Sequence, residues 1–133
     1  MPTTETLISF VEAYKSRVNS LNELLDYLHS LYAEDFTVDD VAAQKFLKTT
    51  VLEPLQDLVV SFDQVEWKPE SIHQMIANTC EKHGIGFGKI GQPLRVAITG
   101  GTQSPSIDLT ITLLDRENVI YRLKKAIEYI TNQ

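Results

Sequence analysis

Cysteine is almost absent from the sequence, because Cys80 is the only one in 133 residues. An internal disulfide is therefore excluded, and this cysteine usage is typical of a reducing cytoplasm. The chain also has no apolar run of about 18 residues, the length that a membrane-spanning helix needs. Its first residues lack the basic and apolar regions of a secretory signal. We therefore expect a cytoplasmic protein that does not enter a membrane.

The sequence lacks the residues that are characteristic of several kinds of active site. The sequence has three histidines, His29, His73 and His83. None has a cysteine or acidic partner at ligand spacing, so we predict no metal site. No serine occupies a G-x-S-x-G motif. The glycines between 84 and 91 suggest a phosphate-binding loop, but Ile90 follows Lys89 where such a loop has serine or threonine. Cys80 falls on the apolar face of a predicted helix and is expected to pack there.

Acidic residues are missing from one long stretch, between Glu81 and Asp108, although the whole chain has a net charge of −6. Residues 1–66 contain 12 acidic and 4 basic residues, whereas residues 67–133 contain 6 and 8. The stretch without acids carries three basic residues, Lys82, Lys89 and Arg95. A polyanion would be attracted to it locally. An ordinary fluctuation of charge explains the pattern equally well, so charge alone does not decide the function.

Helical periodicity dominates the first half of the chain. Apolar residues recur at helical spacing in four segments before residue 63, which predicts four helices. The expected caps are Thr3 or Thr4, Ser20 with Glu23, Asp39, and Thr50 with Glu53. Pro54 falls in the first turn of the fourth helix, where its missing N–H costs little.

The second half is expected to be helical as well. Pro69 should begin a helix that Gly84 ends, and Asp115 should cap a last helix with Arg122, Lys124 and Lys125 outside. Residues 84–106 look loop-like except at 92–100, and both 94–99 and 107–113 have patterns that strands share. The flanking residues favour helices. Pro93 and Pro105 fall where first-turn prolines belong, and Gly100 falls where a C-terminal cap belongs. We predict an all-α fold of two subdomains, 1–66 and 67–133, with the seam near 65–69.

One string in the second half is specific enough to indicate a family. Gly88-Lys89-Ile90-Gly91-Gln92-Pro93-Leu94-Arg95-Val96-Ala97-Ile98-Thr99-Gly100, followed by Ser104-Pro105, resembles the GK-x-x-QPLR-x-A-x-TG…SP signature of bacterial glutamyl-tRNA synthetases. Upstream, Arg17-Val18-Asn19-Ser20-Leu21-Asn22-Glu23-Leu24 looks like the family's R-x-x-T-L-x-E-L segment, with serine in place of threonine. The resemblance covers nearly the whole chain.

This resemblance implies two helical subdomains that form an α-helix cage around the anticodon loop of glutamate tRNA. It also implies residue roles. Arg95 would contact the anticodon bases, Ser104 would contact them from the turn before a helix, and Ile107 would pack against a base. Arg17 would help to separate glutamate from glutamine anticodons. From the charge pattern rather than the resemblance, we expect Lys82 and Lys89 to add positive charge to the tRNA-binding surface.

Residue chemistry supports these roles independently. Proteins read unpaired RNA bases by stacking and by hydrogen bonds to base edges, and the guanidinium of Arg95 can do both. Ser104 before Pro105 would place a hydroxyl and free N–H groups at a helix N-terminus. The structural alternatives are that Arg95 pairs with a carboxylate and that Ser104 only caps a helix. RNA reading requires Arg95 and the 104–107 turn to face one concave surface.

The HIGH and KMSKS motifs of class I synthetases do not occur in the sequence. We therefore expect a fragment that begins at an added or internal Met1 and is not an enzyme by itself. It would carry no cofactor, with ATP and Mg²⁺ bound by the missing catalytic part, and it would be a monomer. Two alternatives stay open. One is a helical protein–protein interaction module that uses the acidic first half, and the other is a small enzyme acting on a phosphate ligand.

Overall fold

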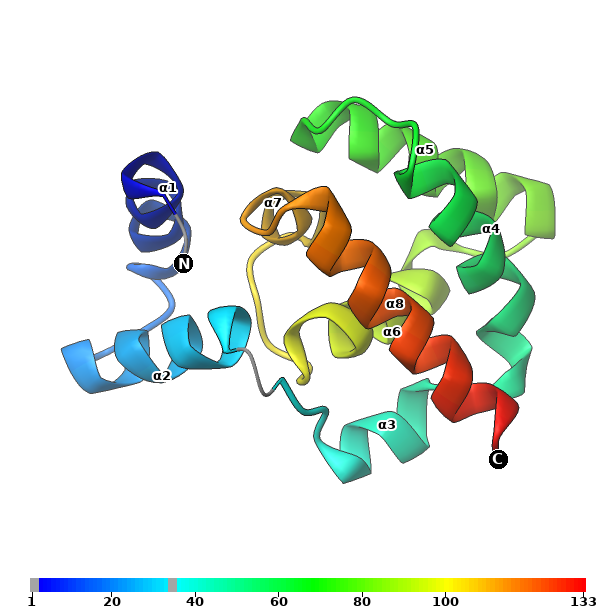
Figure 1. Ribbon diagram of the computed structural model, residues 1–133, viewed down its shortest axis with the longest axis horizontal. Helices are drawn as coiled ribbons and strands as arrows, with labels where there is room; N and C mark the ends of the chain where they lie inside the picture. The colour runs from blue at the N-terminus through cyan, green and yellow to red at the C-terminus, as the bar shows by residue number, and fades with distance from the viewer. Residues whose placement is uncertain (1–2, 34–35) are drawn as a thin grey trace.

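The computed structural model describes residues 3–33 and 36–133, so that the predicted start at Met1 lies outside the described residues. Every regular element within those ranges is helical, which confirms the predicted all-α class. The elements are α1 (Thr4–Tyr14), α2 (Leu21–Tyr32), α3 (Asp40–Phe46), the 3₁₀ turn η1 (Thr49–Val51), α4 (Leu52–Phe62), α5 (Pro69–His83), α6 (Phe87–Thr99), α7 (Ile107–Thr112) and α8 (Arg116–Thr131) (Figure 1). No helix of the described residues is long and apolar enough to cross a membrane.

Helices α3 to α8 pack together, and α1 and α2 lie to one side of them (Figure 1). Helix α6, which carries the QPLR motif, is central, because it contacts α2, α3, α4, α5, α7 and α8. Helix α4 packs most extensively against α8 and also against α5. The helices on either side of the predicted seam therefore share one core. The division into 1–66 and 67–133 stays a prediction.

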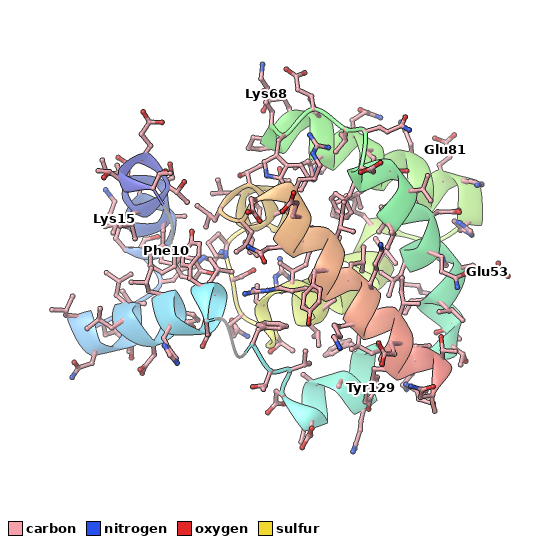
Figure 2. All side chains as sticks on the ribbon, viewed as in Figure 1. Phe10, Lys15, Glu53, Lys68, Glu81 and Tyr129 are labelled. Carbon is pink, nitrogen blue, oxygen red and sulfur yellow. The ribbon has the colours of Figure 1, made fainter. Side chains whose placement is uncertain are left out.

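The core is built from apolar side chains of every helix. Phe62 in α4 is fully buried, and its ring meets Trp67 edge-on with 6.0 Å between centroids. Phe10 and Tyr14 stack at 4.6 Å on the buried face of α1. Cys80 is buried in this core, as predicted. Charged side chains such as Glu53, Lys68 and Glu81 point outward (Figure 2).

Four of the predicted N-caps are confirmed. They are Thr3, Ser20, Asp39 and Asp115, and the side chain of each accepts a hydrogen bond from the backbone N–H three positions later. The Glu23 carboxylate completes the box at Ser20 by accepting from the N–H of Asn19 at 2.8 Å. The predicted box at Thr50 and Glu53 is wrong, because η1 precedes α4 and no side chain caps that helix.

Proline and glycine positions were predicted with mixed success. Pro69 begins α5 and Pro54 lies in the first turn of α4, as predicted. Gly84 and Gly100 end α5 and α6 in left-handed backbone, with φ of 64° and 84°. The first-turn prediction for Pro93 is wrong, because α6 begins six residues earlier and encloses it. The first-turn prediction for Pro105 is wrong as well, because Pro105 precedes Ser106, the N-cap residue of α7.

The early start of α6 has a tertiary cause. Ile90, Leu94 and Ala97 recur at helical spacing and are fully buried, so packing outweighs the cost of two glycines and a proline in one helix. The prediction of a loop therefore fails from Phe87 to Gly91.

Arg122 was predicted to face outward and is instead 5% exposed. Its Nη1 donates a hydrogen bond to the carbonyl of Ile98 at 2.7 Å, and its Cζ lies 3.9 Å from the ring centroid of Phe36. Burial lowers the pKa of Arg122 to about 10, so the group is still charged at neutral pH. Phe36 therefore packs on Arg122 of α8, which explains why the prediction is wrong.

Candidate functional site

Arg95 reaches from the last turns of α6 to the turn that follows the helix. Its Nε donates to the hydroxyl of Ser104 at 2.7 Å, and Nη2 lies 3.4 Å from the carbonyl oxygen of Pro105. Nη1 donates to Oε1 of Gln92, one turn earlier on the same helix. Arg95 is half-buried. Arg95 and the 104–107 turn therefore lie together, whereas the concave surface that they are expected to share stays a prediction.

The other two predicted residues of this turn are buried. Ser104 is 6% exposed, accepts from Arg95 and donates to the Pro105 carbonyl at 2.8 Å. It does not cap a helix, because Ser106 is the N-cap residue of α7. Ile107, the first residue of α7, is 3% exposed. Among these three predicted residues, only Arg95 presents much of its side chain to solvent.

Arg17 lies close enough to Arg95 for their charges to interact, although the helices from α2 to α5 separate the two residues in sequence. Burial lowers the pKa of Arg95, and the positive charge of Arg17 lowers it further. Burial, followed by the neighbouring Tyr27, raises the pKa of Tyr14 to about 12, so that phenol is neutral at pH 7. No carboxylate forms a salt bridge with either arginine in the described ranges. The alternative that Arg95 pairs with an acidic residue is therefore wrong for this structure.

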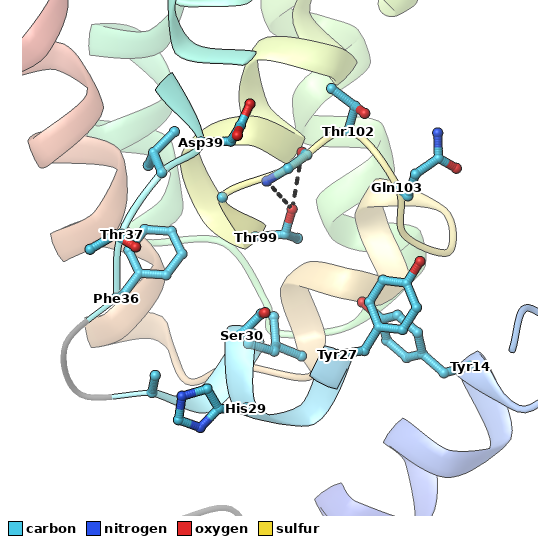
Figure 3. A pocket seen from close by; sticks show the side chains of 15 residues that line it. Tyr14, Tyr27, His29, Ser30, Phe36, Thr37, Asp39, Thr99, Thr102 and Gln103 are labelled. Atoms are coloured by element: carbon cyan, nitrogen blue, oxygen red, sulfur yellow. Dashed lines mark hydrogen bonds between the residues drawn. The ribbon is translucent and has the colours of Figure 1, made fainter. Parts of the chain in front are cut away.

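A groove of about 520 Å³ opens between α2 and the turn after α6. Its aromatic lining comes from Tyr14, Tyr27 and Phe36, and the rings of the two tyrosines are 5.0 Å apart (Figure 3). Residues 99–103 form the facing wall, where the Thr99 hydroxyl accepts from the N–H of Gly101 at 3.2 Å. An aromatic wall opposite polar backbone is suited to a planar ring with hydrogen-bonding edges.

The sequence did not reveal this groove. Tyr14 falls in the first of the four apolar segments, where its spacing predicts only packing, and no pattern assigns a role to Tyr27. The lining residues come from α1, α2, the segment after it and the turn after α6, so no local motif contains them. The only signal in the sequence was the closeness of Tyr14 to the Arg17 motif.

Lys82 and Lys89 lie apart from Arg95. Lys82 lies 3.1 Å from the Asp57 carboxylate, which also binds His83 at 2.6 Å. These hydrogen bonds, from His83 first and then Lys82, hold the pKa of Asp57 below its usual value. The C-terminal end of α5 lies across the molecule from the start of α7 (Figure 1). Lys89 is exposed and is about 9 Å along α6 from Arg95 and about 120° around it.

A metal centre has no support from the described part of the chain, where no three histidine, cysteine or acidic side chains are grouped to hold an ion. The candidate site therefore consists of Arg95 on the turn, with Arg17 and the aromatic groove beside it.

Comparison with known proteins places these features in context. A family model described as an anticodon binding domain matches residues 1–127. A glutamate–tRNA ligase from Francisella philomiragia subsp. philomiragia is 38% identical over 130 residues, which are 95% of this chain and 28% of the relative. The chain thus spans only 28% of the length of that curated relative.

Two solved structures have the same fold. The crystal structure of a glutamate tRNA ligase from Elizabethkingia meningosepticum, in complex with its amino acid, matches with a TM-score of 0.88 and 22% identity. The match covers 98% of this chain and 26% of that one. A glutamate–tRNA synthetase from Elizabethkingia anophelis matches with a TM-score of 0.80 and 23% identity, over 96% of this chain and 25% of that one.

Proposed function

This chain belongs to the anticodon-binding domain family, and we propose that it is the part of a glutamate–tRNA ligase that binds the anticodon loop of glutamate tRNA. The observation that carries the proposal is the placement of Arg95. Its guanidinium is fixed on the turn at Ser104, with Arg17 and an aromatic groove beside it, and no carboxylate of residues 3–33 or 36–133 is bound to it.

The geometry leaves part of the Arg95 guanidinium free for RNA. An arginine has five N–H donors, and three of them point at Ser104, Gln92 and Pro105. The remaining two N–H groups can donate to a base edge or a phosphate. Arg17 adds a second positive charge, and Tyr27, which is partly exposed in the groove, offers a ring face for stacking by an unpaired base.

Ser104 takes a different role in this proposal from the one that the resemblance implied. Its hydroxyl is buried and is already bound to Arg95 and Pro105, so it acts through the orientation of Arg95. Direct base contacts of Ser104 and Ile107 stay predictions, because both side chains are almost fully covered. The role of Arg17 in separating glutamate from glutamine anticodons also stays a prediction.

The remaining features of the proposal concern the whole ligase. Activation of glutamate, with its ATP and Mg²⁺, would belong to the parts of the parent enzyme that this chain does not contain. The chain would bind tRNA as a monomer in the cytoplasm and would not charge it. Lys89 would contribute general attraction for phosphates at a distance from the bases, and Lys82 would do so less because it is paired with Asp57.

The experiment is a titration of two RNAs, glutamate tRNA and a copy with a changed third anticodon base. A wrong base typically costs about 1–3 kcal/mol in nucleic-acid readers, so we expect about 5-fold to 150-fold weaker binding of the changed tRNA. Arg95→Ala should remove most of this discrimination. Arg95→Lys, which keeps the charge and loses the planar fork, should remove it as well.

Lys89→Ala is the matched control for charge. It should weaken both tRNAs alike and reduce the salt slope by about one, because it removes one phosphate contact. Equal affinity of the unchanged protein for the two tRNAs would contradict the proposal. If the protein shows no affinity for RNA at any salt concentration and forms a stable complex with another protein, the interaction-module alternative is supported. The family match does not favour that alternative.

A further inference from the structure

Gln92 is the only amide side chain that holds Arg95 within the described part of the protein. It lies three positions before Arg95 on α6, so the two side chains leave neighbouring points of the same helix face. Its Oε1 accepts a hydrogen bond from Nη1 of Arg95, and both side chains are half-buried. This contact fixes one edge of the guanidinium.

The other edge is held by the turn that leads into α7. Nε of Arg95 donates to Ser104 at 2.7 Å, and behind it lies the hydroxyl of Thr110, which is fully buried. The Thr110 hydroxyl is 3.3 Å from the Ser104 oxygen, 3.1 Å from the Pro105 carbonyl and 2.9 Å from the Ser106 carbonyl. These hydrogen bonds hold the turn against α7, and Gln92 holds the guanidinium of Arg95 from the α6 side.

A glutamine suits this task better than a carboxylate. An amide oxygen accepts from the guanidinium and orients it without cancelling its positive charge. An aspartate or glutamate would bind the group more strongly, but it would also reduce the attraction for phosphate that a tRNA-binding surface needs. The structure therefore contains an acceptor that can hold the Arg95 plane and leave its charge available.

We propose that Gln92 is a positioning residue, which fixes the plane in which Arg95 presents its two free N–H groups to the RNA. This inference rests on the proposed function. A guanidinium held at both edges can meet only a base edge of matching geometry. A guanidinium held at a single edge can rotate to meet other bases. Loss of the Gln92 contact should therefore reduce discrimination between anticodon bases more than it reduces the affinity for tRNA.

The test compares Gln92→Met and Gln92→Glu by two measurements. The first is the ratio of the Kd values for glutamate tRNA and the copy with the changed third anticodon base. The second is the NMR order parameter of the Arg95 Nε–H in the free protein. Gln92→Met keeps the size of the side chain and removes the acceptor, so the ratio should fall by about tenfold and the order parameter should decrease.

Gln92→Glu is the conservative variant that should rescue positioning. It keeps an acceptor for Nη1, so the Kd ratio and the order parameter should stay near those of the unchanged protein. Its added negative charge should weaken both tRNAs alike. Gln56→Met, on the exposed face of α4, removes an amide away from Arg95 and should change neither measurement. A thermal unfolding curve for each variant separates loss of fold from loss of positioning.

The outcomes distinguish this inference from the proposed function. An unchanged ratio and an unchanged order parameter in Gln92→Met would overturn the positioning role, as would a Gln92→Glu variant that loses discrimination. If Arg95→Ala leaves both tRNA affinities unchanged, the proposed function fails. In that case the order parameter still decides whether Gln92 holds the Arg95 side chain.

Discussion

Gly100→Ala is expected to lower the free energy of unfolding by about 2–4 kcal/mol. Gly100 has a φ of 84°, a left-handed conformation that a side chain makes costly. A Cβ at this position would also lie 2.6 Å from the backbone carbonyl oxygen of Thr37 and 3.4 Å from the ring of Phe36. The backbone cannot move away freely, because the N–H of Asp39 donates to the Gly100 carbonyl at 2.9 Å.

Gly101→Ala is the matched control for this substitution. A Cβ at Gly101 would meet nothing within 4 Å, and its φ is not positive, so the change in stability should be within about 0.5 kcal/mol. Urea denaturation of the two variants measures the difference. Equal stability of Gly100→Ala and Gly101→Ala would show that the segment from Phe36 to Asp39 does not pack on Gly100 as described. Because the same turn lines the aromatic groove, tRNA affinity should fall with Gly100→Ala as well.

Phe62→Ala is expected to cost about 3–5 kcal/mol, the largest loss of stability among the substitutions considered. Phe62 is fully buried near the end of α4, the helix that packs most extensively against α8. Removal of its ring leaves a cavity beside Trp67, whose Nε1 is fixed by a 2.8 Å hydrogen bond to the Leu114 carbonyl and so resists collapse into the space. The loss would be a large fraction of the total stability of a domain of this size.

Val60→Ala, two positions earlier on α4, provides the comparison. Val60 is 68% exposed, so its truncation should change the free energy of unfolding by less than about 0.5 kcal/mol. Chemical denaturation followed by tryptophan fluorescence reports on both variants, because Trp67 is the only tryptophan. A loss below about 1 kcal/mol for Phe62→Ala would contradict a shared core of α4, α5 and α8.

Helix ends were predictable from the sequence where a side chain can cap the backbone locally. Ser20, Asp39 and Asp115 each bond the N–H three positions later, as their spacing indicated. Such a bond needs no distant partner, so the sequence contains all the information. Prediction failed at Thr50 and at Pro93, where packing in the folded chain decided the start of a helix.

The candidate site was predicted in part. The resemblance led to Arg95 and Ser104, and their hydrogen bond of 2.7 Å confirms that they lie together. Burial of Ser104 and Ile107 was not foreseen, because it depends on how α7 and the turn before it pack against other helices, and α7 packs on α5 and α6. Arg17 was predicted from a separate motif, and only the fold shows that its charge acts on Arg95.

The sequence by itself determined the all-α class, most of the caps and the family, because these depend on local hydrogen bonds, apolar periodicity and a continuous motif. The tertiary structure decided which of the predicted residues are accessible. Arg122 is buried against Phe36, Arg95 is held by Gln92 and Ser104, and the aromatic groove forms from four separate segments. The physical reason is that burial and charge proximity depend on contacts between residues far apart in the chain, and local patterns do not record them.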